Sequence, residues 1–195
     1  MPITAVTATN IPSLSTGYIS SLTAADVKSM TTAQVNALTS VQIAALPSAD
    51  ILALSQAQLA AFTPKTFSDG LLIYGGGGNK PALSVTQVNA LSTAVLNNFG
   101  TAHVAYFNNN DIKALSNSQI GSLQSTFVSA LNTSQVLALN ATQIGALGTL
   151  NIKAIDSTAI NKLSAAQLQG ITTGQINALS TSVLNALGAT QIKSL

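Results

Sequence analysis

An eight-residue repeat constrains this chain more than any other feature. The octads run without a gap from Thr7 to Phe62 and again from Ser84 to Leu195, seven in the first block and fourteen in the second. Their consensus is [S/T/N]-x-x-Q-[I/V]-x-A-L, and we number its positions 1 to 8. Such a regular register predicts one small structural unit stacked many times, rather than a globular domain.

The apolar residues of the octad occupy fixed positions. Position 5 is Ile, Val or Leu in all 21 octads, and position 8 is Leu, Phe, Ile or Met in all of them. Position 7 is Ala in 12 octads, which allows close approach of a neighbouring backbone. We therefore expect positions 5, 7 and 8 to form the buried side of each unit.

The first half of each octad carries the signals of a helix start. Position 1 is Ser, Thr, Asn or Asp in 16 octads, residue types that favour the N-cap, and position 4 is Gln in ten. Gln three residues after the cap completes a capping box, and the apolar residue before the cap pairs with position 5 as a hydrophobic staple. Each octad is therefore predicted to hold one short helix that begins at position 2 and ends near position 8.

Two other folds compete with this interpretation. In one long helix the apolar stripe would drift by roughly 80° per octad, so it could not face a single partner. A β-solenoid fits the alternation of positions 5 and 7, but Ala, Leu and Gln favour helix. We expect an all-α solenoid of very short helices, with the β-solenoid as the alternative.

The repeat also divides the chain. Residues 1–6 form a lead-in, 7–62 and 84–195 hold the octads, and 63–83 interrupt them. The interruption contains Gly75–Gly78 and a short apolar stretch, Leu71, Leu72, Ile73 and Tyr74, that is compatible with a strand. It is either an assembly or binding loop or a tolerated insertion. Its Gly run is not a phosphate-binding loop, because Pro81 follows Lys80 where that motif has Ser or Thr.

Composition excludes several classes of function. Only 6% of residues are charged, the net charge is +2, and the basic residues are all Lys. Nucleic-acid binding normally needs clustered basic residues, so we expect no nucleic-acid partner. No apolar run approaches the ~18 residues of a membrane span. The N-terminus lacks the charged and apolar regions of a Sec signal peptide.

The sequence offers little for catalysis or metal binding. There is no Cys, and His103 is the single His. His103 stands at position 4, one octad before Asp111, so the two side chains could lie near each other; a capping substitute for Gln is the simpler interpretation. We expect no catalytic residues, no cofactor site and no metal site, and therefore no enzyme.

Runs of L-[S/T]-T-x-Q-[I/V]-x-A-L resemble the repeat tracts of very long bacterial surface and biofilm-matrix proteins of the adhesin type. The resemblance covers 7–62 and 84–195. It implies export by a route other than Sec, such as a type I system, an extracellular or cell-surface location, and a structural or adhesive role.

The octads are also similar to the opening helix of TAL-effector DNA-binding repeats, which reads L-T-x-x-Q-V-x-A-I. Leu38, Thr39, Gln42, Ile43 and Leu46 fit that pattern. The similarity would imply DNA binding, but the period there is about 34 residues, a length typical of helical-pair repeats, and not eight. The second helix and the base-reading loop do not recur.

These observations predict a structural protein that associates with itself. Both end octads keep the consensus, so we expect uncovered apolar faces at the two ends and head-to-tail assembly into a filament, adhesin stalk or matrix. The predicted interface residues are Ile11, Leu14, Ile192 and Leu195, with Leu71, Leu72, Ile73 and Tyr74 of the interruption. The alternative is a solenoid that binds a glycan, ice or a protein partner.

Overall fold

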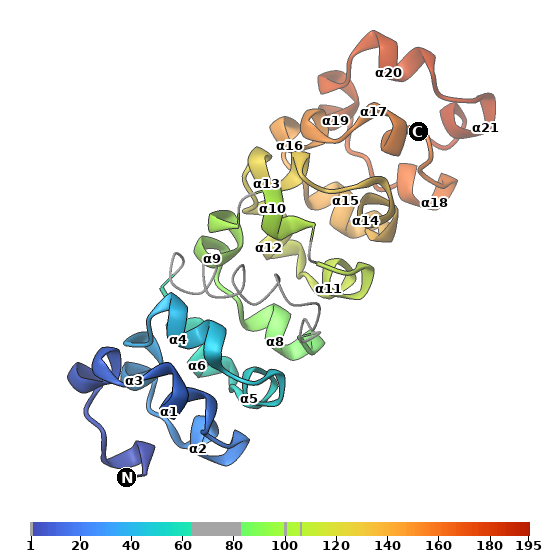
Figure 1. The fold of residues 1–195 in the computed structure, drawn as a ribbon. Helices are drawn as coiled ribbons and strands as arrows, with labels where there is room; N and C mark the ends of the chain where they lie inside the picture. Colours follow the sequence, from blue (N-terminus) through green and yellow to red (C-terminus); the bar gives the residue numbers. More distant parts are fainter. Residues whose placement is uncertain (1, 64–82, 100, 106) are drawn as a thin grey trace. The chain divides into compact units, whose positions relative to one another are not determined.

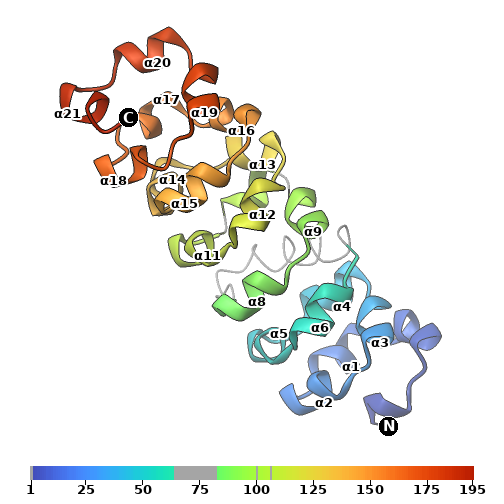
Figure 2. The same cartoon turned by 180° about the vertical axis from the view of Figure 1, so that it is seen from behind.

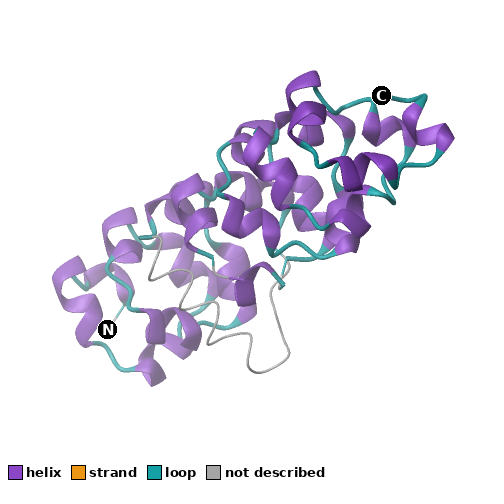
Figure 3. Cartoon of the chain, turned by 90° about the horizontal axis from the view of Figure 1, so that it is seen from above, coloured by secondary structure: helices purple, strands orange, loops and turns teal. Residues whose placement is uncertain are grey.

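The computed structural model describes residues 2–63, 83–99, 101–105 and 107–195 (Figure 3). Every regular element in these ranges is a helix, and none of the described residues forms a strand. The prediction of an all-α fold is confirmed, and the β-solenoid alternative is not favoured.

The chain divides into two compact units, Met1–Phe99 and Gly100–Leu195. The boundary lies between octads, and not at the interruption of the repeat. The first unit contains η1 Ile3–Ala5, η2 Ala8–Ser13, α1 Thr16–Ser20, α2 Ala24–Ser29, α3 Thr32–Asn36, α4 Ser40–Ala45, α5 Ser48–Ala53, α6 Gln56–Ala61, α8 Val85–Ala90 and α9 Thr93–Asn98 (Figure 1).

The second unit continues the pattern of one short helix per octad. It contains α10 Thr101–Val104, α11 Asn109–Ala114, α12 Asn117–Gly121, α13 Ser125–Ser129, α14 Thr133–Ala138, α15 Ala141–Ala146, α16 Thr149–Ala154, α17 Ser157–Ile160, α18 Ala165–Leu168, α19 Thr173–Ala178, α20 Thr181–Asn185 and α21 Ala189–Ile192.

Helix α4 shows how the consensus works locally. The Thr39 side chain accepts from the Gln42 backbone N–H, and the Gln42 side chain accepts from the Thr39 N–H, so the predicted capping box is present. The helix begins at position 2, as predicted, and ends at Ala45. Leu46, at position 8, is already extended with ψ of 131°. One extended residue redirects the chain, which is why the helix ends before position 8 rather than at it.

The first octad departs from α-helical geometry because of its proline. Pro12 lies at position 6 and has no N–H to give to the carbonyl four residues earlier, so residues 8–13 form a 3₁₀ helix. The register also reaches back into the lead-in. Ile3 and Val6, at the places of positions 5 and 8, are both buried.

Packing within each unit joins many of the described helices to the third one after them. In the first unit α1 contacts α4, α2 contacts α5 and α3 contacts α6; in the second, α12 contacts α15 and α13 contacts α16. Both views show these pairs side by side (Figures 1 and 2). A turn of the solenoid therefore contains between three and four octads, and positions 5 and 8 face its interior.

Successive turns approach each other most closely where a glycine Cα lies against a backbone carbonyl of the neighbouring turn. A Cβ on Gly170 would overlap the Ala141 carbonyl oxygen, and one on Gly145 would lie 2.7 Å from the Gly170 oxygen. Because a real side chain cannot occupy either place, glycine here sets the separation of α15 and α18.

Candidate functional site

The Gln side chain at position 4 makes bonds in two directions. In Gln42, Oε1 accepts from the Thr39 N–H at 3.0 Å, which caps its own helix. Its Nε2 donates to the carbonyls of Ile11 at 2.7 Å and Leu14 at 2.9 Å. These acceptors lie 31 and 28 residues earlier, at positions 5 and 8 of the octad four before. The amide therefore ties two successive turns together while it caps a helix.

The same pair of long-range bonds recurs in both units. Donation to the carbonyls 31 and 28 residues earlier is made by Gln34, Gln58, Gln135, Gln143 and Gln175. Gln167 and Gln191 reach the carbonyls 30 and 28 residues earlier. We call this set of bonds the glutamine ladder. It gives the position-8 carbonyls at the helix C-termini a donor, and it gives the position-5 carbonyls, which already accept the position-8 N–H, a second one.

The ladder continues across the interruption of the repeat. Gln87 Nε2 donates to the carbonyls of Ile51, Leu52 and Leu54, at 3.1–3.2 Å. Helix α8 also packs against α6. The first octad after residues 63–83 therefore stacks on the preceding turn as an uninterrupted octad does.

Among the position-4 side chains that the structure describes, only Gln both caps its own helix and donates to the preceding turn. Asn151, which is shorter, donates one bond to the Leu123 carbonyl at 2.7 Å and makes no capping bond for its helix. Asp111 accepts from the Asn108 N–H at 2.9 Å but has nothing to donate, and burial raises its pKa although its bonds to Asn108 oppose the rise. The sequence held a signal for this second role. Glu would cap equally well, yet the chain contains none.

The predicted assembly residues occupy unlike environments. Ile11 is fully buried and Leu14 is half-buried, whereas Ile192 and Leu195 are 54% and 42% exposed. The expectation that both end octads expose an apolar face is therefore wrong for Ile11. The remaining four, Leu71, Leu72, Ile73 and Tyr74, lie outside the described residues.

The direction of stacking explains this asymmetry. Each octad is followed by later octads that pack against it: α3 contacts η2, which contains Ile11, and Gln42 of α4 donates to the Ile11 carbonyl. Exposure of position 5 rises through the last octads, from half-buried Ile176 and Leu184 to Ile192. We call the surface formed by Ile176, Leu184, Ile192 and Leu195 the trailing face.

The first three octads are among the eleven of 21 that lack Gln at position 4. They carry Asn10, Tyr18 and Asp26 where the ladder has Gln. Asp26 accepts from the Thr23 N–H and hydroxyl, and the hydroxyl bond chiefly lowers the pKa of its carboxyl. These octads therefore do not offer the paired amide donors of the ladder.

The residues weighed for catalysis do not form a described site. His103 belongs to α10, but its side chain lies outside the described part, so its distance from Asp111 is not defined. Across the described ranges, no three His, Cys, Asp or Glu side chains gather closely enough to hold a metal ion. No described helix is both long enough and apolar enough to cross a membrane.

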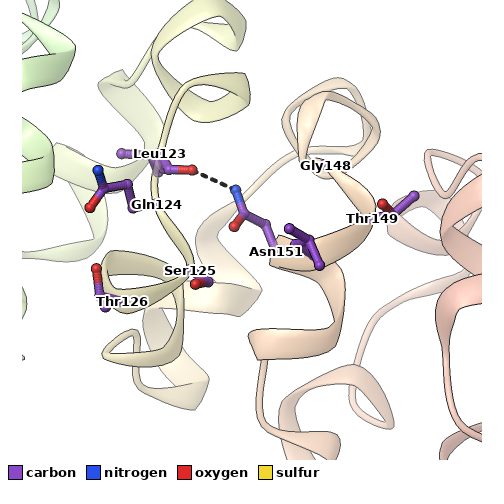
Figure 4. A pocket seen from close by; sticks show the side chains of 8 residues that line it. Leu123, Gln124, Ser125, Thr126, Gly148, Thr149 and Asn151 are labelled. Carbon is purple, nitrogen blue, oxygen red and sulfur yellow. Dashed lines mark hydrogen bonds between the residues drawn. The ribbon is translucent and has the colours of Figure 1, made fainter.

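A shallow hollow lies between α13 and α16, where two helices begin side by side (Figure 4). It is lined by Leu123, Gln124, Ser125, Thr126, Gly148, Thr149, Leu150 and Asn151. Neither helix has a side-chain cap bond. The helices have only five and six residues, and the side-chain amide of Asn151 already donates to Leu123, so the hollow carries no evident ligand chemistry.

Comparison with known families agrees with the repeat. The model of the ALTTAQ repeat matches residues 11–48 and 144–181. Both matches begin at position 5, and both are longer than the 31-residue reach of the ladder. A search of curated proteins finds no match. The chain is a helical repeat protein that is similar to the ALTTAQ repeat over these two stretches.

Proposed function

We propose that this chain is a structural protein that associates with itself, in an extracellular filament, adhesin stalk or biofilm matrix, and that it is not an enzyme. The trailing face carries the proposal, because Ile192 and Leu195 expose positions that are buried in the middle of each unit. The extracellular setting rests on the resemblance to adhesin tracts alone.

The chemistry of the two surfaces predicts how strong the association is. The first three octads of a second copy, residues 7–30, would cover the trailing face in the same way that later octads cover earlier ones within one chain. Their Asn10, Tyr18 and Asp26 cannot rebuild the paired amide bonds of the ladder. Burial of apolar area would therefore hold the joint. We expect reversible, concentration-dependent assembly rather than a permanent polymer.

Sedimentation velocity of the full chain over a wide concentration range, followed by negative-stain microscopy, tests the proposal. The native chain should gain mass with concentration and form linear particles. Ile192→Ser should shift assembly to higher concentration, because it removes exposed apolar area from the trailing face.

Leu150→Ser is the matched control. Leu150 is 74% exposed but lies at position 3, away from the trailing face. The control should assemble as the native chain does. A native chain that remains monomeric at every concentration, or equal loss of assembly in both variants, would contradict the proposal.

A further inference from the structure

Octad 47–54 lacks both kinds of hydrogen bond that the position-4 Gln makes in the ladder, the bond to its own N-cap N–H and the bonds to the preceding turn. Its N-cap is Pro47, which has no N–H for a position-4 oxygen to accept. Its position 4 is Asp50, which has no proton to donate when it is ionised. Helix α5 accordingly has no side-chain cap bond.

Asp50 is buried despite this lack of partners. Its side chain is 3% exposed, and its Oδ2 has no hydrogen-bond partner. Asp26 and Asp111 stand at the same octad position, but each accepts a backbone N–H from its own N-cap residue. An ionised carboxylate buried without a donor costs far more than a neutral one.

The register of the ladder predicts which groups the Asp50 carboxyl faces. Counting back from Asp50 by the reach of the ladder gives Ile19 and Leu22, whose carbonyls correspond to its acceptors. The octads on either side keep their bonds: Gln42 donates to Ile11 and Leu14, and Gln58 donates to Val27 and Met30. By the same register, we expect acceptor oxygens on both sides of the joint at Asp50, with no amide between them.

The charges around Asp50 also disfavour its ionised form. Helix α2 packs against α5 and carries Asp26 and the exposed Lys28; α1 carries Tyr18. The described helices α4, α6 and α8 carry no charged residue. Burial, and to a lesser degree the Asp26 carboxylate, raises the pKa of Asp50.

We propose that Asp50 is a proton-dependent contact between two turns of the first unit. The protonated carboxyl donates its O–H to a main-chain carbonyl at Ile19 or Leu22, in place of the Gln amide. Release of that proton to water removes the bond and leaves a carboxylate facing carbonyl oxygens. The joint between α5 and the preceding turn is therefore tight in acid and loosens as the pH rises.

The sign of the effect comes from linkage. Because folding raises the pKa of this carboxyl, its contribution is fully present below the ordinary Asp value of about 4 and is lost as the pH rises through the folded value. Between the two values the folded chain holds one more proton than the unfolded chain. The unfolding constant should then rise by up to about tenfold per pH unit.

Urea unfolding of the full chain between pH 4 and 8, with hydrogen exchange followed in α2 and α5, tests this dependence. Asp50→Asn should remove this residue's contribution to the pH dependence of the free energy of unfolding. Asp50→Gln should remove it too, and it should also slow hydrogen exchange in α5 at high pH. Asp156→Asn is the control. Asp156 is exposed and bonds to Thr158, which lowers its pKa, so its removal should leave the slope in this range unchanged.

Carbon-13 NMR of the Asp50 carboxyl gives a direct readout, with the resonance assigned by its loss in Asp50→Asn. We expect it to titrate above the ordinary value. A native slope that persists in Asp50→Asn, or a carboxyl that titrates at or below the ordinary value, would overturn the proposal.

Discussion

Octads 140–147 and 188–195 share the same consensus but bury it to different extents. In both, the position-4 Gln caps its own helix and donates to the preceding turn. Yet Ile144 is 1% exposed and Ile192 is 54% exposed. The two octads differ in their coverage by a later turn, because α15 is covered by α18, whereas no described helix packs on the far side of α21.

This difference separates two sources of order in the repeat. Capping and the backward bonds of the ladder depend on an octad and the turn before it, so they are present in both places. Burial of position 5 depends on the turn after it. A two-turn helix is not stable alone, so the stability of an octad should rise with the number of turns that cover it.

Truncation of the position-5 side chain should give the largest difference between the two octads in the free energy of unfolding. Ile144→Ala should lower the free energy of unfolding by about 2–5 kcal/mol, because it leaves a cavity beneath the following turn. Ile192→Ala should cost less than about 1 kcal/mol, since that side chain is already partly in water. Urea unfolding of the two variants measures the difference; equal losses would show that coverage by the following turn does not govern stability.

Conversion of the ladder amide to an acid should have the next largest effect. Gln143→Glu keeps an oxygen for the Asn140 N–H but removes the bonds to the carbonyls of Ile112, Lys113 and Leu115. We expect a loss of about 1–3 kcal/mol or more, because a buried charge faces acceptors. Gln191→Glu, in a half-buried position, should lose less. Thermal melts at pH 7 compare them, and an unchanged Gln143→Glu variant would contradict a role for the amide donors.

Substitution at an exposed position should have the smallest effect. Asn177 lies at position 6 of α19 and is exposed to solvent. Asn177→Ala should change the free energy of unfolding by no more than about 0.5 kcal/mol, in the stabilising direction, because Ala has the higher helix propensity. A loss as large as that of Ile144→Ala would mean that the assigned register is incorrect.

Much of the local structure was predictable from the octad alone. A cap such as Thr39, a Gln three residues later and an apolar staple specify where a helix begins, because these bonds form within one octad. The buried places of positions 5 and 8 could be inferred from their constant apolar character. The residue at which each helix ends could not be predicted as closely, because packing and not a local sequence signal makes position 8 extended.

The candidate surfaces were harder to predict. Ile11 and Ile192 have equivalent places in the consensus, and their sequences do not show that one is sealed and the other open. The sequence also did not indicate that Asp50 lacks a hydrogen-bond donor. An Asp at position 4 looks like an ordinary capping residue until the carbonyls of the preceding turn are placed against it.

The sequence by itself determined the helical unit, its register and its polar caps, since these depend on contacts within one octad. The tertiary structure decided how many octads complete a turn and which carbonyls receive the Gln amides. It also decided which apolar faces remain open. Those features depend on contacts between residues that lie 28 to 31 positions apart in the sequence. How closely the helices of successive turns pack sets these contacts, and glycines such as Gly170 allow the close packing because they leave room for a neighbouring carbonyl.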